Sequence, residues 1–206
     1  DLILSPRPYF VKTMQIDKPV QRAMVYATAH GMFELNLNGQ KVGNDFFRPG
    51  WSDYRYRLYY NTYDITTQLQ SGKNDITAIL ADGWYTGYIG WGKRRNHYAG
   101  PNKIRVQVMI DYEDGSKEII GTDASWSVLK QTPILEGDFL HGEVHDARLE
   151  AAMSVDGPAA LSADQDTPGI QLDAYPGENV IAVTEFPAKK ISEPQPGVFV
   201  YDLGQN

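Results

Sequence analysis

The chain has 206 residues, enough for one domain with a sizeable buried core or for two small domains. Its net charge of −7 argues against a nucleic-acid partner, because nucleic-acid modules usually present a basic face. The absence of cysteine excludes disulfides, thiolate metal sites and a cysteine nucleophile, and no apolar run approaches the roughly 18 residues of a membrane span, so no membrane partner is expected.

Alternation of apolar and polar residues predicts β-strands along the chain. Residues 33–37 alternate in this way and lead into Asn38-Gly39, a pair that favours a tight hairpin turn because both residues tolerate positive φ. Residues 104–112 repeat the pattern and end in a second hairpin at Asp114-Gly115. Further strands are expected near 8–13, 22–29, 56–63, 75–81, 125–130, 179–186 and 197–203.

One short helical turn is expected, with Asp64 capping residues 65–69 before Gly72. Many short strands joined by Gly, Pro and Asn turns predict an all-β fold, a jelly-roll-type β-sandwich of two sheets.

Charge and turn residues divide the chain unevenly. Residues 131–206 carry 13 Asp and Glu against 3 Lys and Arg, together with several Pro-Gly turns. We therefore place the sandwich at 1–150 and an irregular connecting segment with one or two strands at 151–196. Residues 197–206 are expected to begin a further β-domain that is truncated, so the sequence reads as a piece of a longer protein.

Aromatic residues are concentrated in one stretch, since 13 of the 24 lie between residues 46 and 98 among Asp, Asn and Arg. Rings that fill the core would explain part of this density. The functional interpretation is a sugar platform, because the apolar C–H face of a pyranose packs on an aromatic ring while its hydroxyls bond to polar neighbours. The candidate sugar-binding residues are Trp51, Asp82, Trp84, Tyr85, Trp91 and Arg94.

The Gly-rich loop 86–101 is a reasonable place for a ligand on a rigid sandwich, although its glycines lack the spacing of a dinucleotide-binding motif. Calcium is the metal to test, because carboxylate, amide and carbonyl oxygens are its usual ligands. The candidate ligands are Asn44, Asp45, Asn96 and the carbonyl of Pro101.

Five short motifs, in one order and spacing, resemble a known family. They are Leu-Asn-Gly-Gln-Lys-Val-Gly at 37–43, Arg-Pro-Gly-Trp-Ser-Asp-Tyr at 48–54, Tyr-Asp-Ile-Thr at 63–66, Asp-Gly-Trp-Tyr-Thr-Gly at 82–87 and Gly-Glu-Val-His-Asp-Ala-Arg at 142–148. The chain resembles the N-terminal β-sandwich of bacterial α-L-rhamnosidases, glycoside hydrolase family 78. Residues 200–206 resemble the opening of the next β-domain, whereas His145 stands where the family usually has an aromatic residue.

The resemblance implies a non-catalytic role for this chain. Family members hydrolyse terminal α-L-rhamnose with inversion, using carboxylates of a downstream (α/α)₆ barrel that is absent here, so no catalytic residue and no rhamnosidase activity are expected. In some relatives the sandwich is a calcium-dependent rhamnose-binding module. The implied partners are a rhamnose-containing glycan and the downstream domains of the parent chain, and the implied location is periplasmic or extracellular.

Two alternatives stay open. A purely structural domain predicts buried rings and no groove, and an independent enzyme would use acidic residues such as Asp82 and Glu143. For Glu143 and Arg148, a charged pair that staples a strand or a domain contact is favoured over catalysis.

Overall fold

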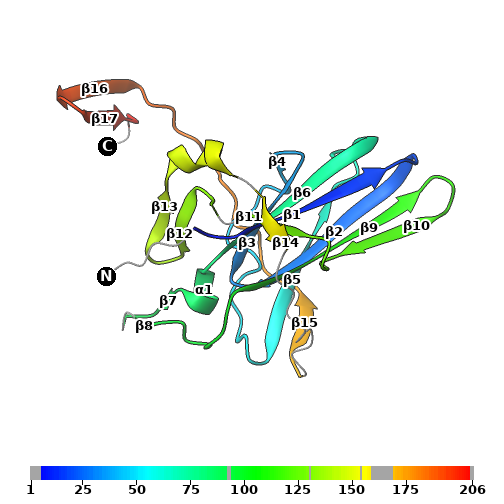
Figure 1. The fold of residues 1–206 in the computed structure, drawn as a ribbon. Helices are drawn as coiled ribbons and strands as arrows, with labels where there is room; N and C mark the ends of the chain where they lie inside the picture. The colour runs from blue at the N-terminus through cyan, green and yellow to red at the C-terminus, as the bar shows by residue number, and fades with distance from the viewer. Residues whose placement is uncertain (1–5, 92–93, 130, 154, 159–168, 205–206) are drawn as a thin grey trace.

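The computed structural model describes residues 6–91, 94–129, 131–153, 155–158 and 169–204. Figure 1 shows most of the strands gathered into two layers, with a small hairpin set apart near the C-terminus. The all-β, jelly-roll-type sandwich expected from the sequence is confirmed.

One sheet has the strand order β14-β11-β1-β6-β3-β4. Its strands are β1 (Tyr9–Ile16), β3 (Met32–Leu37), β4 (Gln40–Lys41), β6 (Gly72–Ala81), β11 (Ser127–Leu129) and β14 (Val155–Pro158). The other sheet has the order β10-β9-β2-β5-β15. Its strands are β2 (Val20–His30), β5 (Arg57–Asp64), β9 (Lys103–Tyr112), β10 (Lys117–Gly121) and β15 (Gln171–Ala174).

Long antiparallel pairings hold each sheet together. β1 pairs with β6 from Tyr9 opposite Ile79 to Ile16 opposite Gly72. β2 pairs with β9 along its whole length. β15 instead adds to the edge of β5 in parallel, in a register that ends with Ala174 opposite Tyr60.

The core lies between the two sheets, because each strand turns alternate residues inward. On β6 the inward positions are fully buried and end in Leu80, while the intervening positions are half-buried. Trp126 fills the core ahead of β11, and its indole Nε1 donates to the Gly121 carbonyl at 2.9 Å. The buried apolar cluster draws on both sheets, which fixes how they face each other.

Both predicted hairpin turns are confirmed. Asn38 and Gly39 have φ of 53° and 79°, the left-handed conformation that a two-residue turn requires. At the second turn Gly115 has φ of 82°, and the Tyr112 amide donates to the Ser116 carbonyl at 2.9 Å.

The strand expected at 179–186 is wrong. Val180, Ile181 and Val183 are β-branched residues that favour a strand, but all three are exposed, so no buried face stabilises a strand there. A single bridge between Asp45 and Ile181 is present instead.

The helical turn expected at 65–69 is a hydrogen-bonded turn and not a helix. Asp64 still serves it, because its Oδ1 accepts from the Thr66 amide at 2.9 Å. The described helices are α1 (Gly83–Thr86) and the 3₁₀ helix η1 (Ala147–Ala152), and neither is long enough to cross a membrane.

Three short antiparallel pairs complete the fold. β7 (Tyr88–Ile89) pairs with β8 (Arg94–Arg95), and β12 (Ile134–Asp138) pairs with β13 (Gly142–His145). The third pair, β16 (Lys190–Gln195) and β17 (Val198–Asp202), is the hairpin that stands away from the two sheets in Figure 1.

Candidate functional site

Four aromatic side chains, Phe47, Trp51, Trp84 and Phe139, form a continuous row, here called the aromatic face. The rings of Trp51 and Trp84 lie parallel, with 4° between their planes and 6.3 Å between centroids. Phe139 packs against Trp84 at 4.8 Å and against Phe47 at 5.2 Å. Trp51 is 53% exposed, Phe47 and Phe139 are also exposed, and Trp84 is half-buried.

Two glycines permit the local backbone that carries the tryptophans. Gly83, at the start of α1, has φ of 52°, and a Cβ there would lie 2.5 Å from the Met32 Cγ. Gly50, directly before Trp51, has φ of 95°, and a Cβ there would lie 2.5 Å from the Tyr175 ring. Any larger residue would clash at both positions. Glycine is therefore required where the backbone beside Trp84 packs against Met32 and the backbone beside Trp51 packs against Tyr175.

Beneath the face lies a buried aromatic stack. The Tyr85 ring stacks on His30 at 4.4 Å and on Tyr98 at 5.7 Å, and Tyr54 meets all three rings edge-on. The Trp51 indole donates to the Tyr98 hydroxyl at 3.3 Å, which ties the exposed ring to the stack.

Burial shifts the pKa of two side chains in this stack, His30 and Tyr54. Desolvation, with the Lys103 charge as a smaller cause, lowers the pKa of His30 to about 4, so its ring is neutral at pH 7. Neither His30 ring nitrogen has a hydrogen-bond partner within the described part of the chain. Burial likewise raises the pKa of Tyr54 well above its ordinary value.

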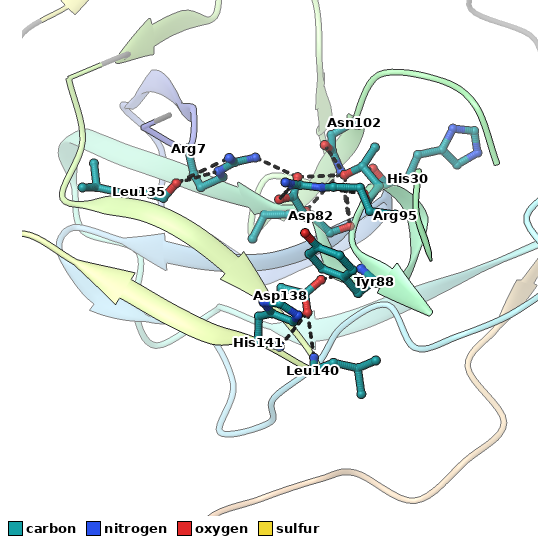
Figure 2. Close-up of polar contacts among 12 residues, drawn as sticks. Arg7, His30, Asp82, Tyr88, Arg95, Asn102, Leu135, Asp138, Leu140 and His141 are labelled. Atoms are coloured by element: carbon teal, nitrogen blue, oxygen red, sulfur yellow. Dashed lines mark hydrogen bonds and ion pairs between the residues drawn. The ribbon is translucent and has the colours of Figure 1, made fainter. Parts of the chain in front are cut away.

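Asp82 anchors the loop that follows α1, as Figure 2 shows. Its carboxylate is 2% exposed and accepts from Arg7 Nη1 and Arg95 Nη2, each at 2.7 Å. The Thr86 hydroxyl donates to the same group at 2.8 Å. Asn102 donates to the backbone carbonyl of Asp82 at 3.4 Å, which closes the base of the loop. The buried charge is therefore balanced by two guanidinium groups.

Asp138 makes a second anchor beside the first (Figure 2). Its carboxylate accepts from the backbone amides of Tyr88, Leu140 and His141 at 2.7 to 2.8 Å. The rings of Tyr88 and His141 then stack at 4.1 Å. Asp138 thus ties β7, which follows α1 and Trp84 in the chain, to the turn that carries Phe139.

The structure separates the six predicted sugar-binding residues into three groups. Trp51 and Trp84 come together on the aromatic face. Asp82 and Tyr85 are buried below it, with both oxygens of Asp82 already bonded. Trp91 and Arg94 are exposed on the loop, and no ring contact joins Trp91 to the face among the described residues.

Sequence reasoning missed Phe139, which lies far from residues 46–98 in the chain. The available signal was an apolar pair, Phe139-Leu140, in a turn where solvent contact is expected.

The predicted calcium ligands do not come together as one set. Asn44 and Asp45 lie beside β5, and the Asp45 carboxylate is bonded by Arg48 and by the Tyr63 hydroxyl. Asn96 instead accepts from the Gly100 amide within its own loop, next to Pro101. No group of three His, Cys, Asp or Glu able to hold a metal occurs in the described residues. Asp45 is the one carboxylate among the predicted ligands, and its pairing with the Arg48 guanidinium does not fit a cation site.

The proposed charged pair of Glu143 and Arg148 is wrong. Arg148 binds Asp146 at 2.6 Å, and its side chain is 89% exposed, while Glu143 lies near His145. An Arg two residues from its carboxylate partner closes a local turn, and within the described residues this pair bridges no distant strands. A contact of Arg148 with another domain stays a prediction.

Residues 18–159 match the family described as the alpha-L-rhamnosidase N-terminal domain. An alpha-L-rhamnosidase of Streptomyces avermitilis is 42% identical over 196 residues, which are 92% of this chain and 19% of that protein. The crystal structure of the S. avermitilis alpha-L-rhamnosidase complexed with L-rhamnose superimposes with a TM-score of 0.82 at 37% identity, covering 98% of this chain and 20% of that one. For the alpha-L-rhamnosidase from Dictyoglumus thermophilum the TM-score is 0.78 at 32% identity, over 98% of this chain and 22% of that one.

The chain spans about a fifth of the length of these relatives. The match covers most of the described sandwich, in sequence and in fold. The chain therefore belongs to the family of alpha-L-rhamnosidase N-terminal domains.

Proposed function

We propose that this chain is a non-catalytic, carbohydrate-binding accessory domain of a larger α-L-rhamnosidase-type glycoside hydrolase, with L-rhamnose as its ligand. The observation that carries the proposal is the parallel pair of Trp51 and Trp84, with Trp51 more than half exposed. Catalysis is assigned to parts of the parent protein outside this chain.

The aromatic face suits a sugar ring physically. Flat aromatic surfaces accept the apolar C–H face of a pyranose, and rings already held by packing lose little conformational entropy on binding. Trp51 is held by Tyr98 and Trp84 by Phe139, so the pair is organised before any ligand arrives. Exposed rings are what a binding surface predicts, whereas a purely structural domain predicts buried ones.

A second role, contact with other domains, is proposed for the β16–β17 hairpin. The β16–β17 hairpin exposes Val198, Phe199, Val200 and Tyr201 in succession. An isolated hairpin is at most marginally stable in water, so its apolar side chains need a further partner surface. We assign that surface to downstream domains of the parent protein, which is consistent with the larger size of the relatives.

Isothermal titration of the chain with L-rhamnose tests the sugar role. We expect saturable heat with a millimolar Kd, about 4 kcal/mol of binding free energy. Trp51→Ala should weaken binding at least about tenfold, a loss of about 1.4 kcal/mol, because it removes half of the parallel pair. Tyr201→Ala is the matched control, since it removes an equally exposed ring outside the aromatic face.

Equal binding by Trp51→Ala and the parent chain would overturn the assignment to the aromatic face. Trp91→Ala, run in the same series, tests the exposed loop ring, and the absence of ring contacts to the face predicts a smaller loss. Absence of heat in the parent chain would leave the hairpin role as the surviving proposal.

The titration is repeated with calcium and with a chelator. Calcium dependence is the prediction from sequence, whereas the Asp45–Arg48 pair favours heat that chelation leaves unchanged. We further propose that the parent protein acts in the periplasm or outside the cell, where polymeric glycans are degraded, and fractionation of the source cells would test this.

A further inference from the structure

A cavity of about 290 Å³ opens at the edge of β5. Its lining joins residues 60–63 of β5 with Asn44, Asp45, Tyr175 and Asn179. None of the four rings of the aromatic face contributes to it. The volume is close to the lower end for small-molecule sites and suits a single sugar ring.

The cavity lies where the second sheet has an open edge. β15 pairs with β5 only as far as Ala174 opposite Tyr60. Beyond that point, among the described strands, β5 pairs with β2 alone. The free edge of residues 61–64 therefore presents backbone N–H and C=O groups beside the cavity.

Asn61 has a buried amide oxygen that lacks a hydrogen-bond partner among the described residues. It is 7% exposed, lines the cavity, and its amide oxygen accepts no hydrogen bond within the described part of the chain. Leaving such a group unpaired costs about 1–3 kcal/mol, and native proteins rarely tolerate it without a reason. An amide offers a donor and an acceptor side by side, and adjacent hydroxyls of a sugar match both.

The charges around the cavity are already balanced. The Asp45 carboxylate is bonded by Arg48 and by the Tyr63 hydroxyl. Arg48 also donates to the Asn179 side chain and lies 4.5 Å from the centre of the Tyr175 ring. These contacts fix one wall of the cavity and leave no excess charge, so a neutral ligand is favoured over an ion.

We propose that this cavity is a second binding site, for one neutral monosaccharide unit, held by the Asn61 amide and the free β5 edge. The Tyr60, Tyr63 and Tyr175 side chains supply apolar surface for the sugar C–H groups. The ligand class rests on the proposed carbohydrate role of the chain, but the site uses different residues from the aromatic face.

Titration with L-rhamnose followed by ¹H–¹⁵N NMR tests both sites at once. The side-chain amide signals of Asn61 report on the cavity, and the indole N–H signal of Trp51 reports on the aromatic face. We expect both to shift, with separate midpoints. Concentrations up to about 100 mM cover a millimolar Kd by a wide margin.

Asn61→Ala should abolish the shifts of backbone amides lining the cavity and leave the Trp51 shift intact. It should also leave the melting temperature unchanged or raise it, because it removes an unpaired buried amide. A purely structural Asn61 would instead lower the melting temperature. Asn36→Ala, a half-buried strand asparagine outside the cavity, is the control and should keep all shifts.

The pattern of shifts distinguishes binding in the cavity from binding at the aromatic face. Shifts at Trp51 with unshifted Asn61 signals would overturn the cavity proposal and keep the proposed function. Shifts of the Asn61 signals alone would keep the cavity proposal and overturn sugar binding at the aromatic face. Cavity shifts that survive in Asn61→Ala would also overturn the role of this side chain.

Discussion

The sandwich and the C-terminal arm, residues 176–204, are built on opposite principles. In the sandwich, strands of both sheets bury alternate side chains, so hydrogen-bonded pairing and apolar burial support the same arrangement. In the arm, β16 and β17 are paired by backbone hydrogen bonds, yet every residue from 176 to 204 is exposed. Backbone pairing alone therefore does not identify which parts of the chain carry its stability.

The contrast has a physical basis. Backbone hydrogen bonds replace bonds to water and contribute modestly, whereas burial of a large apolar side chain contributes about 1.5–3 kcal/mol. The sandwich gains both contributions, and the arm gains only the first. Substitutions of the same kind should therefore have large effects in the sandwich and small ones in the arm.

Truncation of a buried leucine gives the largest expected difference in stability between the sandwich and the arm. Leu35 is 2% exposed on β3, while Leu203 is 42% exposed beyond β17. Leu35→Ala should lower the free energy of unfolding by about 3 kcal/mol, since it removes buried methyl groups and leaves a void. Leu203→Ala should change it by less than about 0.5 kcal/mol. Urea denaturation of both variants measures the difference, and similar losses would contradict the contrast.

Buried charge should give the next largest effect. Asp82→Asn keeps the shape of the side chain but leaves Arg7 and Arg95 without their anion. We expect a loss of about 2–3 kcal/mol, lowered somewhat because both arginines reach solvent. Asp202→Asn, at an exposed position in the hairpin, is the matched control and should be nearly neutral. Thermal unfolding of the pair tests this, and equal melting temperatures would show that the Asp82 anchor adds no stability.

Acid should weaken the sandwich through His30. Its pKa is about 4 in the folded chain and about 6.5 when unfolded, so the unfolded state binds more protons between these values. Stability is then full above about pH 6.5 and falls as the pH drops toward 4. The full difference in pKa would give about 3 kcal/mol, and partial solvent screening reduces this to about 1–2 kcal/mol. Denaturation measured at several pH values in this window tests the effect.

The control for this prediction is His30→Phe, which keeps a ring against Tyr85 and removes the titrating group. The fall in stability between pH 6.5 and 4 should be smaller in the variant than in the parent chain. An identical fall in both would assign it to other groups.

Much of the fold could be predicted because local alternation of apolar and polar residues determines many of its strands. The alternation in residues 33–37 and 104–112 matches β3 and β9, since one face of each strand is buried. The strand predicted at 179–186 was wrong, because its apolar residues are all exposed and no partner surface among the described residues buries them. Sequence reasoning also missed β16, whose sequence of Lys, Glu and Pro has no buried face to reveal it.

The candidate site was only partly predictable. Trp51 and Trp84 were found from composition, because large rings among polar residues indicate a binding surface. The partners of Asp82 were not, since Arg7 lies 75 residues away and only the folded sheets bring the two together. Asn61 was missed because an unpaired amide is a property of its surroundings and leaves no mark in the sequence.

The pairing of β1 with β11 sets a limit on when this domain can fold during synthesis. Tyr9 lies opposite Leu129, so the first strand of the sheet has to wait for a partner made about 120 residues later. At translation rates of about 5–20 residues per second, that delay is roughly 6–24 s. Once β6 has been made, β1 has this partner on one edge and none on the other until β11 follows, so the free edge is exposed to unwanted strand pairing.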